Sequence, residues 1–397
     1  MKMKHSIKVL CMLICLFCTS HAIAQDTAVT TLAKANLAPF MPEGSSFSGL
    51  GWIKIMEAVN KSNDVLIGED HFTNEIPYFT SALVSKVKFD NFFCEIDPFT
   101  ADILQQNIEN LSTVELQKYV NNYGKTFSFY AFTPEFALLK QLTKSNTRIH
   151  GTDQIMVVGD RIICNELQKI TTNKKAKDIY AKIESNSKIY FDNFLKDQSK
   201  PFYFFTEDFG KKLEQLSLLE LSPKEVQIIN ALKLSAKIYK SRSHSLRIQL
   251  MKNQLMDVYS DWADKRNLFK YGANHVPRGE SLMEIYDIGN LVSNINDSKY
   301  KNSLHIMILG TSGTQASPFQ GYPAEKIDEN SSILKTLKPI TSAIDTNQWQ
   351  CLDMLPLRKA LNEGKISISD IKLSRIIKGY DLLVIIPKVT ASKIADH

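Results

Sequence analysis

The stretch VLIGEDHFTNE, residues Val65–Glu75, begins as a continuous apolar run and turns polar at a glycine and a histidine. The stretch LFKYGANHVPRGE, residues Leu268–Glu280, repeats this arrangement far along the chain. Both contain the pattern Gly-x-x-His, at Gly68–His71 and at Gly272–His275. A chain that leaves a buried strand often turns sharply, and glycine permits the backbone angles of such a turn. The repeated pattern therefore predicts two buried strands that each present a histidine at the carboxyl end.

Six short apolar runs predict the strands of the fold, and amphipathic patterns predict helices between them. Several runs are nearly continuous in Val, Ile, Leu and Phe, which is typical of strands covered on both faces. The predicted strands are Val65–Gly68, Asn91–Ile96, Thr147–Gly151, Phe269–Gly272, Leu304–Leu309 and Leu382–Ile386. The predicted helices are Gly51–Asn60, Glu75–Lys86, Pro98–Leu111 and Thr133–Leu142. This alternation predicts an α/β fold with a mostly parallel central sheet flanked by helices.

Residues 159–265 carry helical patterns and no convincing strand. Within them, Ser222–Glu225 has the pattern of a helix start, with a serine cap, a proline in the first turn and a glutamate three residues after the cap. We expect the helix that starts there to continue beyond Arg247. The region is interpreted as a helical insert that forms one wall of a cleft, and the alternative is a helical layer that only packs on the sheet. Residues 321–379 indicate mixed loops and helices.

The composition bounds the class of protein. The chain has 397 residues, of which 44% are hydrophobic and 23% are charged, so it can bury the core of one large domain. Such a composition is not typical of disordered or fibrous proteins. The formal net charge is +6, and the basic residues are scattered among acidic ones rather than grouped. We therefore expect no nucleic acid as a partner.

The first 24 residues, MKMKHSIKVLCMLICLFCTSHAIA, have the pattern of a secretory signal peptide. Lysines precede an apolar run at Val9–Phe17, and Ala22-Ile23-Ala24 follows as an Ala-x-Ala cleavage site. The run is short for a permanent membrane helix, and an uncleaved anchor is the alternative. This interpretation predicts an exported protein, periplasmic or secreted. Residues 25–397 then form a single α/β domain with no transmembrane anchor after cleavage.

Three cysteines follow this peptide, namely Cys94, Cys164 and Cys351. Their odd number and wide spacing predict neither a disulfide framework nor a zinc–thiolate site. Cys94 lies within FFCEID, and we interpret it as a small buried hydrophobic residue.

Polar residues mark the ends of four predicted strands. His71 follows the first strand, Glu95 ends the second, Asp153 follows the third and His275 follows the fourth. In a parallel sheet these ends lie at one edge, and ligands of open α/β sheets bind at that edge. Asp153 is interpreted either as a site residue or as a helix N-cap. Glu69 is interpreted either as a site residue or as part of a solvated face.

Two imidazoles and a carboxylate suit two kinds of chemistry. His71, Glu95 and His275 would together bind one divalent metal such as Zn, Mn or Co, and the metal would lower the pKa of a bound water. Without a metal, His71 would deprotonate water directly and Glu95 would steer it. Arg247 lies on an otherwise apolar helix face, so it should bind an anion of the substrate or form a structural salt bridge.

These segments resemble the erythromycin esterase-like superfamily, whose wider relatives are the Tiki/TraB peptidase-like proteins and the ChaN-type haem-binding proteins. IGEDH resembles the first glycine–glutamate–histidine motif, and FFCEID resembles the second-strand glutamate. RIQLMKNQ resembles the arginine–methionine–asparagine helix, FKYGANH the strand with the second histidine, and RIHGTDQ, more loosely, the glycine–aspartate turn. The resemblance covers about Val65–Asn290 and implies a sheet flanked by helices, with a deep cleft at the strand ends.

The resemblance also implies roles for individual residues. His71 would be the water-activating base or a metal ligand, Glu95 would orient the base or the water, and His275 would complete the site. Arg247 would bind an anion of the substrate or an acid, and Glu69 would be the glutamate of the motif. The residues assigned to substrate binding are Arg247, Glu69 and Asp153.

The sequence departs from erythromycin esterases in two places. Glu69 and His71 stand one residue closer together, and Phe269–Tyr271 replaces a tryptophan-rich strand. These departures argue against macrolides as the substrate, and hydrolysis stays the expected reaction. The expected function is hydrolysis of an ester or amide bond in a small-molecule or peptide substrate by activated water. The alternatives are a haem- or metal-ligand-binding protein, with Tyr271 or His71 as an axial ligand, and a catalytically silent domain that binds a cell-envelope partner.

Overall fold

The computed structural model describes residues 27–319, 321–344 and 347–394. The signal peptide predicted at residues 1–24 lies outside this part of the chain. Among the described residues, no helix combines the length and the apolar character needed to cross a membrane.

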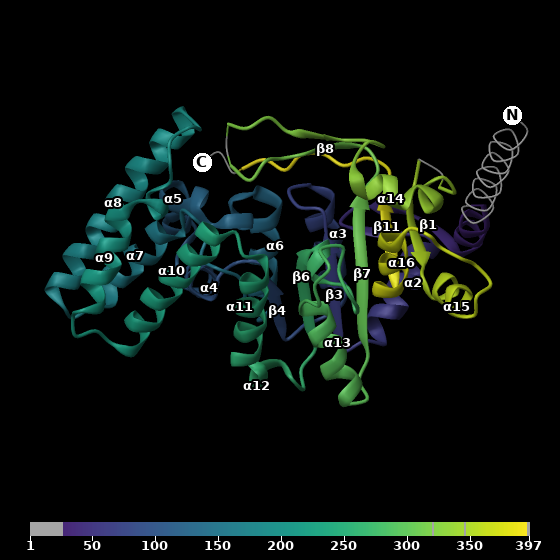
Figure 1. Cartoon of the computed structure of the whole chain (residues 1–397), viewed down its shortest axis with the longest axis horizontal. Helices are drawn as coiled ribbons and strands as arrows, with labels where there is room; N and C mark the ends of the chain where they lie inside the picture. The colour runs from purple at the N-terminus through teal and green to yellow at the C-terminus, as the bar shows by residue number, and fades with distance from the viewer. Residues whose placement is uncertain (1–26, 320, 345–346, 395–397) are drawn as a thin grey trace, which may run out of the picture.

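A mixed sheet of nine strands forms the centre of the described structure (Figure 1). In order across the sheet, the strands are β2 (Ser46–Ser48), β1 (Leu37–Glu43), β10 (Trp349–Asp353), β11 (Leu382–Ile386), β7 (Ser303–Gly310), β3 (Asp64–Glu69), β6 (Asn267–Gly272), β4 (Asn91–Cys94) and β5 (Arg148–Gly151). The six strands from β11 to β5 are parallel, and they are the six that the sequence predicts. Every residue of β3, β4, β6, β7 and β11 is buried, because helices cover both faces of this part of the sheet.

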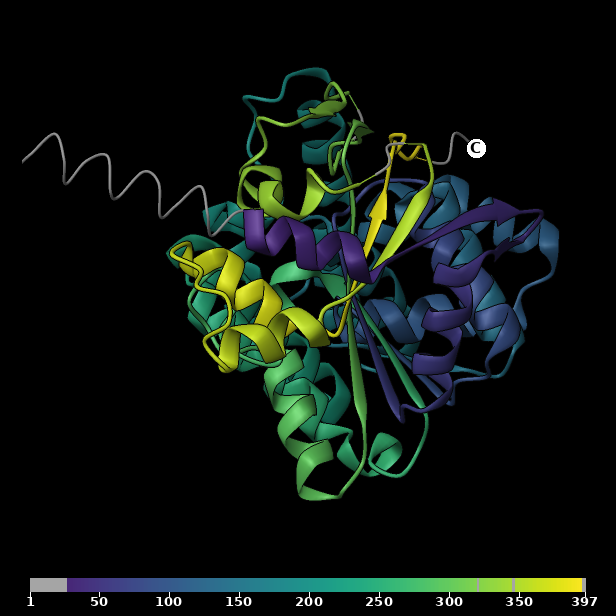
Figure 2. The same cartoon turned by 90° about the vertical axis from the view of Figure 1, so that its right-hand side faces the viewer.

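Helices flank the sheet on two sides, which confirms the predicted α/β fold (Figure 2). On one side lie α2 (Leu50–Asn60), α3 (Glu75–Lys86), α4 (Pro98–Asn110) and α6 (Thr133–Lys144). On the other side lie α13 (Ile288–Ser298), α15 (Leu355–Asn362) and α16 (Ile371–Gly379). The four predicted helices all form, and Asp97 caps α4 by accepting a hydrogen bond from the backbone N–H of Thr100.

Residues 159–265 are helical and contain no strand, as predicted. Their helices are α7 (Gly159–Ile170), α8 (Lys174–Lys196), α9 (Glu207–Ser217), α10 (Pro223–Ser241), α11 (His244–Asp257) and α12 (Tyr259–Trp262). Helices α7 to α10, with α5 (Thr113–Tyr123), form a lobe at the left of Figure 1, beyond β5. Ser222 and Glu225 make the predicted capping box at the start of α10.

The prediction of one helix from Pro223 to beyond Arg247 is wrong. The first helix ends at Ser241, and Arg242 adopts a left-handed backbone conformation with φ of 51°. Ser243 then caps the next helix, because its hydroxyl accepts a hydrogen bond from the backbone N–H of Leu246. Arg247 therefore lies in the first turn of a separate helix, α11, whose direction is set independently of α10.

Three antiparallel strands extend the sheet beyond β11, and the sequence pattern did not predict them. β10 pairs with β11, β1 pairs with β10, and β2 pairs with β1. β10 lies within residues 321–379, which also contain α14 (Ser332–Thr341), α15 and α16. The expectation of mixed loops and helices there is thus incomplete. Phe40, Phe47 and Trp349 pack together across the three strands and fix this edge.

The three cysteines predicted to lie outside any disulfide or metal site are free and buried. Burial raises the pKa of the Cys94 and Cys351 thiols to about 12, so both stay protonated at neutral pH.

Replacement of Gly289 in α13 by alanine is expected to destabilise the fold by about 1–3 kcal/mol, because the structure leaves no space for a side chain. An added Cβ would lie 1.9 Å from the carbonyl oxygen of Val276. Gly210→Ala in α9 is the matched control, since nothing lies within 4 Å of an added Cβ there. It should stabilise the protein by about 0.5–1 kcal/mol. Urea unfolding of both variants measures the difference, and equal effects would contradict the packing of α13 on Val276.

Candidate active site

The structure brings the predicted strand-end residues together at one edge of the sheet. β3, β6, β4 and β5 are consecutive neighbours and run in the same direction. His71 and His275 follow β3 and β6, and Glu95 and Asp153 follow β4 and β5. Residues far apart in the sequence therefore meet because their strands are adjacent.

Glu95 lies at the centre of this group, and its carboxylate is buried. Its Oε1 accepts a hydrogen bond of 2.6 Å from the guanidinium of Arg247, and its Oε2 accepts one of 2.7 Å from the backbone N–H of Gly272. The Nε2 atom of His71 lies 3.5 Å from Oε2, and the Nε2 atom of His275 lies 3.4 Å from Oε1. The two imidazoles thus face the same carboxylate, which confirms the predicted juxtaposition.

The charges around Glu95 determine which groups carry protons. Burial alone would raise the pKa of Glu95, but His275, His71 and Arg247 together hold that pKa well below its usual range. Burial lowers the pKa of His275, yet Glu95 and Asp287 outweigh burial and raise it to about 10. The resting site at neutral pH therefore contains an ionised Glu95 beside a protonated His275.

His71 is oriented by a buried chain of charges. Its Nδ1 atom lies 2.9 Å from Oε1 of Glu69, and Oε2 of Glu69 lies 2.7 Å from the ammonium of Lys270. The same ammonium lies 2.7 Å from Oε1 of Glu135. Because Glu69 accepts the Nδ1–H of His71, Nε2 is the ring nitrogen left to exchange a proton. Burial lowers the pKa of His71, but Glu95 and Glu69 outweigh it and raise that pKa above its usual value.

The alternative interpretation of Glu69 as part of a solvated face is wrong, since only 5% of this residue is exposed. Its two oxygens face His71 and Lys270 rather than open space. Glu75 begins α3, where its carboxylate accepts hydrogen bonds from the backbone and hydroxyl of Thr390. Glu75 therefore fixes a segment near the carboxyl end of the chain.

Arg247 connects Asp153 to Glu95. Its Nε and Nη2 atoms donate hydrogen bonds of 2.9 and 2.6 Å to the two carboxylate oxygens of Asp153, and Nη2 also donates to Glu95. The structural salt bridge considered for Arg247 is therefore present. Asp153 is not a helix N-cap, because the next helix, α7, begins only at Gly159.

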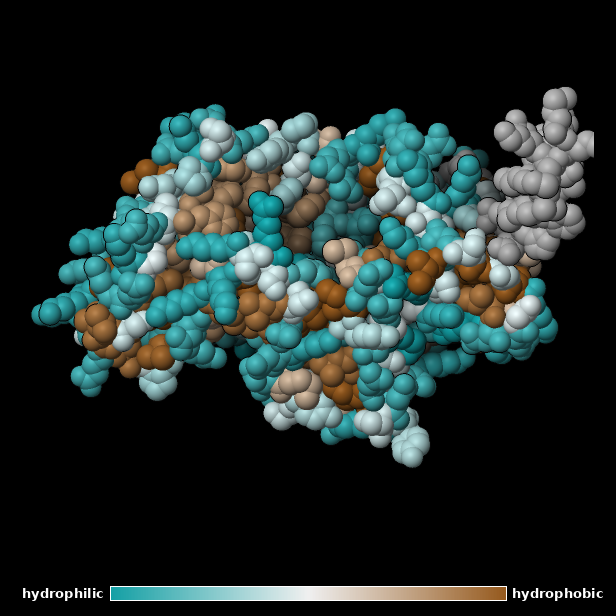
Figure 3. Space-filling view, in the orientation of Figure 1, coloured by the Kyte–Doolittle hydropathy of each residue, from teal (hydrophilic) through white to brown (hydrophobic). Residues whose placement is uncertain are grey.

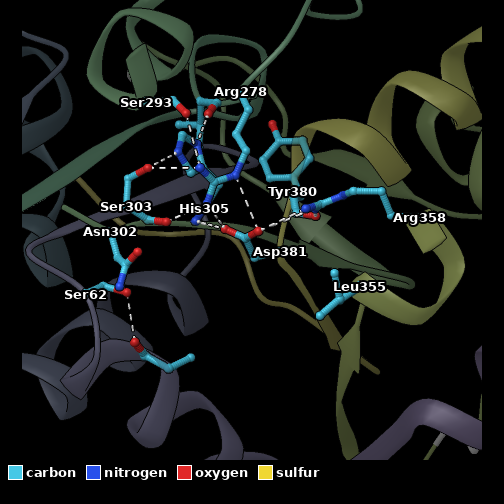
Figure 4. Close-up of polar contacts among 12 residues, drawn as sticks. Ser62, Arg278, Ser293, Asn302, Ser303, His305, Leu355, Arg358, Tyr380 and Asp381 are labelled. Atoms are coloured by element: carbon cyan, nitrogen blue, oxygen red, sulfur yellow. Dashed lines mark hydrogen bonds and ion pairs between the residues drawn. The ribbon is translucent and has the colours of Figure 1, made fainter. Parts of the chain in front are cut away.

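His275 is held from the side opposite Glu95. Its Nδ1 atom lies 2.8 Å from Oδ2 of Asp287, and Oδ1 of Asp287 accepts the backbone N–H of Ile288 at the start of α13. The segment after His275 is fixed by Arg278, which forms hydrogen bonds to Ser303 and Asp381 at the amino ends of β7 and β11 (Figure 4). This network connects the second histidine motif to the far end of the sheet.

The predicted metal site does not fit the observed donors. In the parts of the chain that the structure describes, no three His, Cys, Asp or Glu side chains are arranged to hold a metal ion. Both oxygens of Glu95 already accept hydrogen bonds from Arg247 and Gly272, and the Nε2 atoms of His71 and His275 lie 3.5 and 3.4 Å from those oxygens. The three predicted ligands therefore form an ion-pair cluster.

A cavity of about 250 Å³ opens beside Glu95. Asp153 and Arg247 line it, together with Tyr239 from α10 and the stacked rings of Phe72 and Phe129. The His71 ring packs on Phe129 with 4.5 Å between ring centroids, and 25% of its side chain is exposed. Figure 3 shows a recess between the helical lobe and the sheet on this side of the molecule.

The hairpin of β8 (Gly313–Gln315) and β9 (Glu325–Ile327) crosses above the sheet toward the helical lobe (Figure 1). Within it, Pro318 lines the cavity. Phe319 packs against Phe202 of the lobe, with 5.3 Å between ring centroids. The cavity is therefore bounded by the sheet edge, by the helical lobe and by this hairpin.

Sequence reasoning missed the residues that support the two histidines, namely Lys270, Glu135 and Asp287, and it missed His244, which lies near His275. A lysine inside the apolar run of β6 was a signal that a buried carboxylate lies nearby. The remaining three lack such a signal. His244 starts α11, its ring centroid lies 6.0 Å from that of His275, and its Nε2 atom is buried without a hydrogen-bond partner in the described structure.

Tyr271 does not fit the predicted role of an axial haem ligand. It is fully buried, and its hydroxyl forms a hydrogen bond of 2.7 Å with the hydroxyl of Thr152. The oxygen that a haem iron would need is therefore enclosed in the core.

Gly272→Ala is expected to displace the His71 ring with little loss of stability, because an added Cβ would lie 2.7 Å from His71 Nε2. Separation from Glu95 should lower the pKa of His71 toward its usual value of about 6.5. Gly279→Ala is the matched control, since its added Cβ has nothing within 4 Å. NMR titration of the imidazole resonances checks the result, and an unchanged pKa of His71 in Gly272→Ala would contradict the geometry.

The stability provided by His275 should depend on pH with a defined sign. Its folded pKa of about 10 exceeds the unfolded value of about 6.5. The contribution is therefore complete below about pH 6.5 and is lost as the pH rises through 10. The loss of stability in His275→Gln should shrink from pH 6 to pH 10.

His305 provides the opposite control. Burial lowers its pKa to about 3, so its contribution should instead be lost as the pH falls below about 6.5. Chemical unfolding of His275→Gln and His305→Gln from about pH 4 to about pH 10 separates the two behaviours. A constant difference for His275→Gln would show that His275 is not protonated in the fold.

No family model and no curated protein matches this sequence. An erythromycin esterase, EreC, in its open conformation matches with a TM-score of 0.55 and 14% identity, over 87% of this chain and 95% of that one. A succinoglycan biosynthesis protein matches with a TM-score of 0.53 and 14% identity, over 94% of this chain and 99% of that one. A Bacillus cereus protein matches with a TM-score of 0.52 and 15% identity, over the same shares. Haem-binding ChaN of Campylobacter jejuni gives a TM-score of only 0.31 and supports no argument.

At these identities the similarity shows the fold alone. It confirms the predicted resemblance at that level, and the match extends over nearly the whole of the matched chains. This chain thus has the fold of an erythromycin esterase.

Proposed function

We propose that this protein is an exported hydrolase that cleaves an ester or amide bond of a small-molecule or peptide substrate with water activated by His71. The observation that carries the proposal is the pair of imidazoles that share the buried carboxylate of Glu95 beside a cavity. The shared fold with an erythromycin esterase supports it. Export rests on the signal-peptide pattern of residues 1–24.

His71 is the general base of the proposed reaction. In its neutral form it donates Nδ1–H to Glu69, so the lone pair of Nε2 accepts a proton from water while the water oxygen attacks the carbonyl carbon. The imidazolium that forms lies between Glu69 and Glu95, and both carboxylates stabilise its charge.

Arg247 supplies positive charge for the oxyanion of the tetrahedral intermediate, and His275, which does not line the cavity, stabilises the charge of Glu95 behind it. Both lie on Oε1 of Glu95, and the guanidinium of Arg247 lines the cavity. Positive groups that are already fixed before the reaction stabilise the developing oxyanion without reorganisation. When the intermediate collapses, the bond to the leaving group breaks and the His71 imidazolium returns its proton to the departing oxygen or nitrogen.

A haem-binding function has no comparable support. Tyr271 is enclosed in the core, and His71 already packs against Phe129. The hydrolase is therefore the function that the geometry favours.

His71→Ala and Glu95→Gln should each lower kcat/KM by at least about 100-fold, as expected when a general base or its charged partner is removed. The measurement uses a panel of p-nitrophenyl esters and aminoacyl p-nitroanilides with the full mature chain. Glu109→Gln on α4, an exposed carboxylate, is the matched control and should retain full activity. If both site variants hydrolyse any substrate of the panel at the wild-type rate, the proposed mechanism is wrong.

A further inference from the structure

The two Gly-x-x-His motifs share a second property besides their histidines. The residues before the histidines, Asp70 and Asn274, both line another cavity, of about 330 Å³. The histidines themselves face Glu95. Each motif therefore directs its fourth residue to the catalytic carboxylate and its third residue to a separate space at the same edge of the sheet.

The rest of this second cavity combines apolar residues with the polar side chains of Ser332, Thr336 and Lys372. Leu282, Met283, Met307 and Ile333 form its apolar walls, from the loop before α13, from β7 and from α14. Such walls suit a flexible hydrocarbon chain, because methionine side chains adapt to irregular shapes. The cavity thus combines an apolar wall with a small number of polar groups, which is the general form of a small-molecule site.

The polar groups of this cavity have no partners within the protein. Among the described residues, neither the carboxylate of Asp70 nor the side-chain amide of Asn274 has a hydrogen bond or an ion pair. By contrast, Glu69, Glu95 and Asp153 all pair with cations. A partly buried carboxylate without a donor is unfavourable until a donor reaches it. Burial raises the pKa of Asp70 to about 6, so the group is ionised above neutral pH.

Asp70 is the acid that a bound cation would meet in this cavity. The charges that act on Asp70 are the neighbouring His71 and Glu69, whereas the exposed Lys372 on the wall is not among them. The cavity therefore presents a carboxylate without a hydrogen-bond donor, and the amide of Asn274 lines the same cavity. The carboxylate and the amide oxygen are both acceptors for N–H donors.

We propose that this cavity is a binding subsite for a primary ammonium group carried on an apolar chain, with Asp70 and Asn274 as its acceptors. If the proposed hydrolase function holds, the substrate is an amphipathic amine whose ester or amide bond extends from this subsite to His71 and Glu95. That assignment of the substrate class rests on the proposed function, whereas binding of the ammonium group does not.

The test compares two probes of equal length, n-hexylamine and 1-hexanol, in calorimetric titrations of the full mature chain at pH 8. The wild type should bind hexylammonium at least tenfold more tightly than hexanol. Asp70→Asn should remove this preference, because an amide cannot provide the charge. Glu284→Gln, an exposed carboxylate in the loop next to Met283, is the matched control and should keep the preference. Equal binding of the two probes by the wild type, or an unchanged preference in Asp70→Asn, overturns the proposal.

A second measurement does not depend on the variant folding. At pH 5 the Asp70 carboxyl of the wild type is largely protonated, so the preference for hexylammonium should fall toward that of Asp70→Asn. A preference that stays constant from pH 8 to pH 5 contradicts the role of Asp70.

The outcomes also separate this inference from the proposed function. Hexylammonium binding that depends on Asp70, together with no hydrolysis of any ester or amide, would retain the subsite and reject the hydrolase. Hydrolysis that depends on His71 and Glu95, together with probe binding that does not depend on Asp70, would retain the hydrolase and reject the subsite.

Discussion

The burial of one carboxylate, that of Glu95, is the constraint on which the rest of the site depends. A buried charge without partners is strongly unfavourable, and here it is compensated by a guanidinium, a backbone N–H and two imidazoles. Arg247 comes from α11, Gly272 from β6, and the histidines from the ends of β3 and β6. The sheet, helix α11 and the loops after β3 and β6 must therefore all be in place before Glu95 has its partners.

Gly272 shows how tightly this arrangement is packed. Its N–H donates to Glu95, while the space that a side chain would occupy is filled by the His71 ring. The glycine of the second motif thus makes room for the histidine of the first, and it does so without a positive φ. The glycine of the first motif makes room for a different group, since a Cβ added at Gly68 would lie 3.1 Å from the backbone of Ala273 and from the side chain of Val276.

The parts of the fold that the sequence predicts well are those fixed by burial on both faces. The parallel strands from β11 to β5 are continuous apolar runs, and their order brings the strand-end residues together. β10 was missed because WQCLD mixes polar and apolar residues at the start of an antiparallel edge. The end of α10 was missed because the left-handed residue there is Arg242. The sequence therefore lacks the glycine that usually marks the end of a helix. The predicted metal site does not fit the observed donors for a related reason, since ligand types can be recognised in a sequence but their other hydrogen-bond partners cannot.

A buried chain of charged groups runs from His71 through Glu69 and Lys270 to Glu135, and it links the base to a carboxyl group outside the strand ends. Burial raises the pKa of Glu135 to about 7, whereas Lys270, together with His71, outweighs burial and keeps the pKa of Glu69 below its usual value. Near neutral pH a proton can therefore bind or leave at Glu135, while Glu69 stays ionised. Because Glu69 and Glu135 share the ammonium of Lys270, a change of charge at Glu135 acts on Glu69 and on His71. Lys270 neutralises two buried carboxylates at once, which is a physical reason for a lysine in the interior of β6.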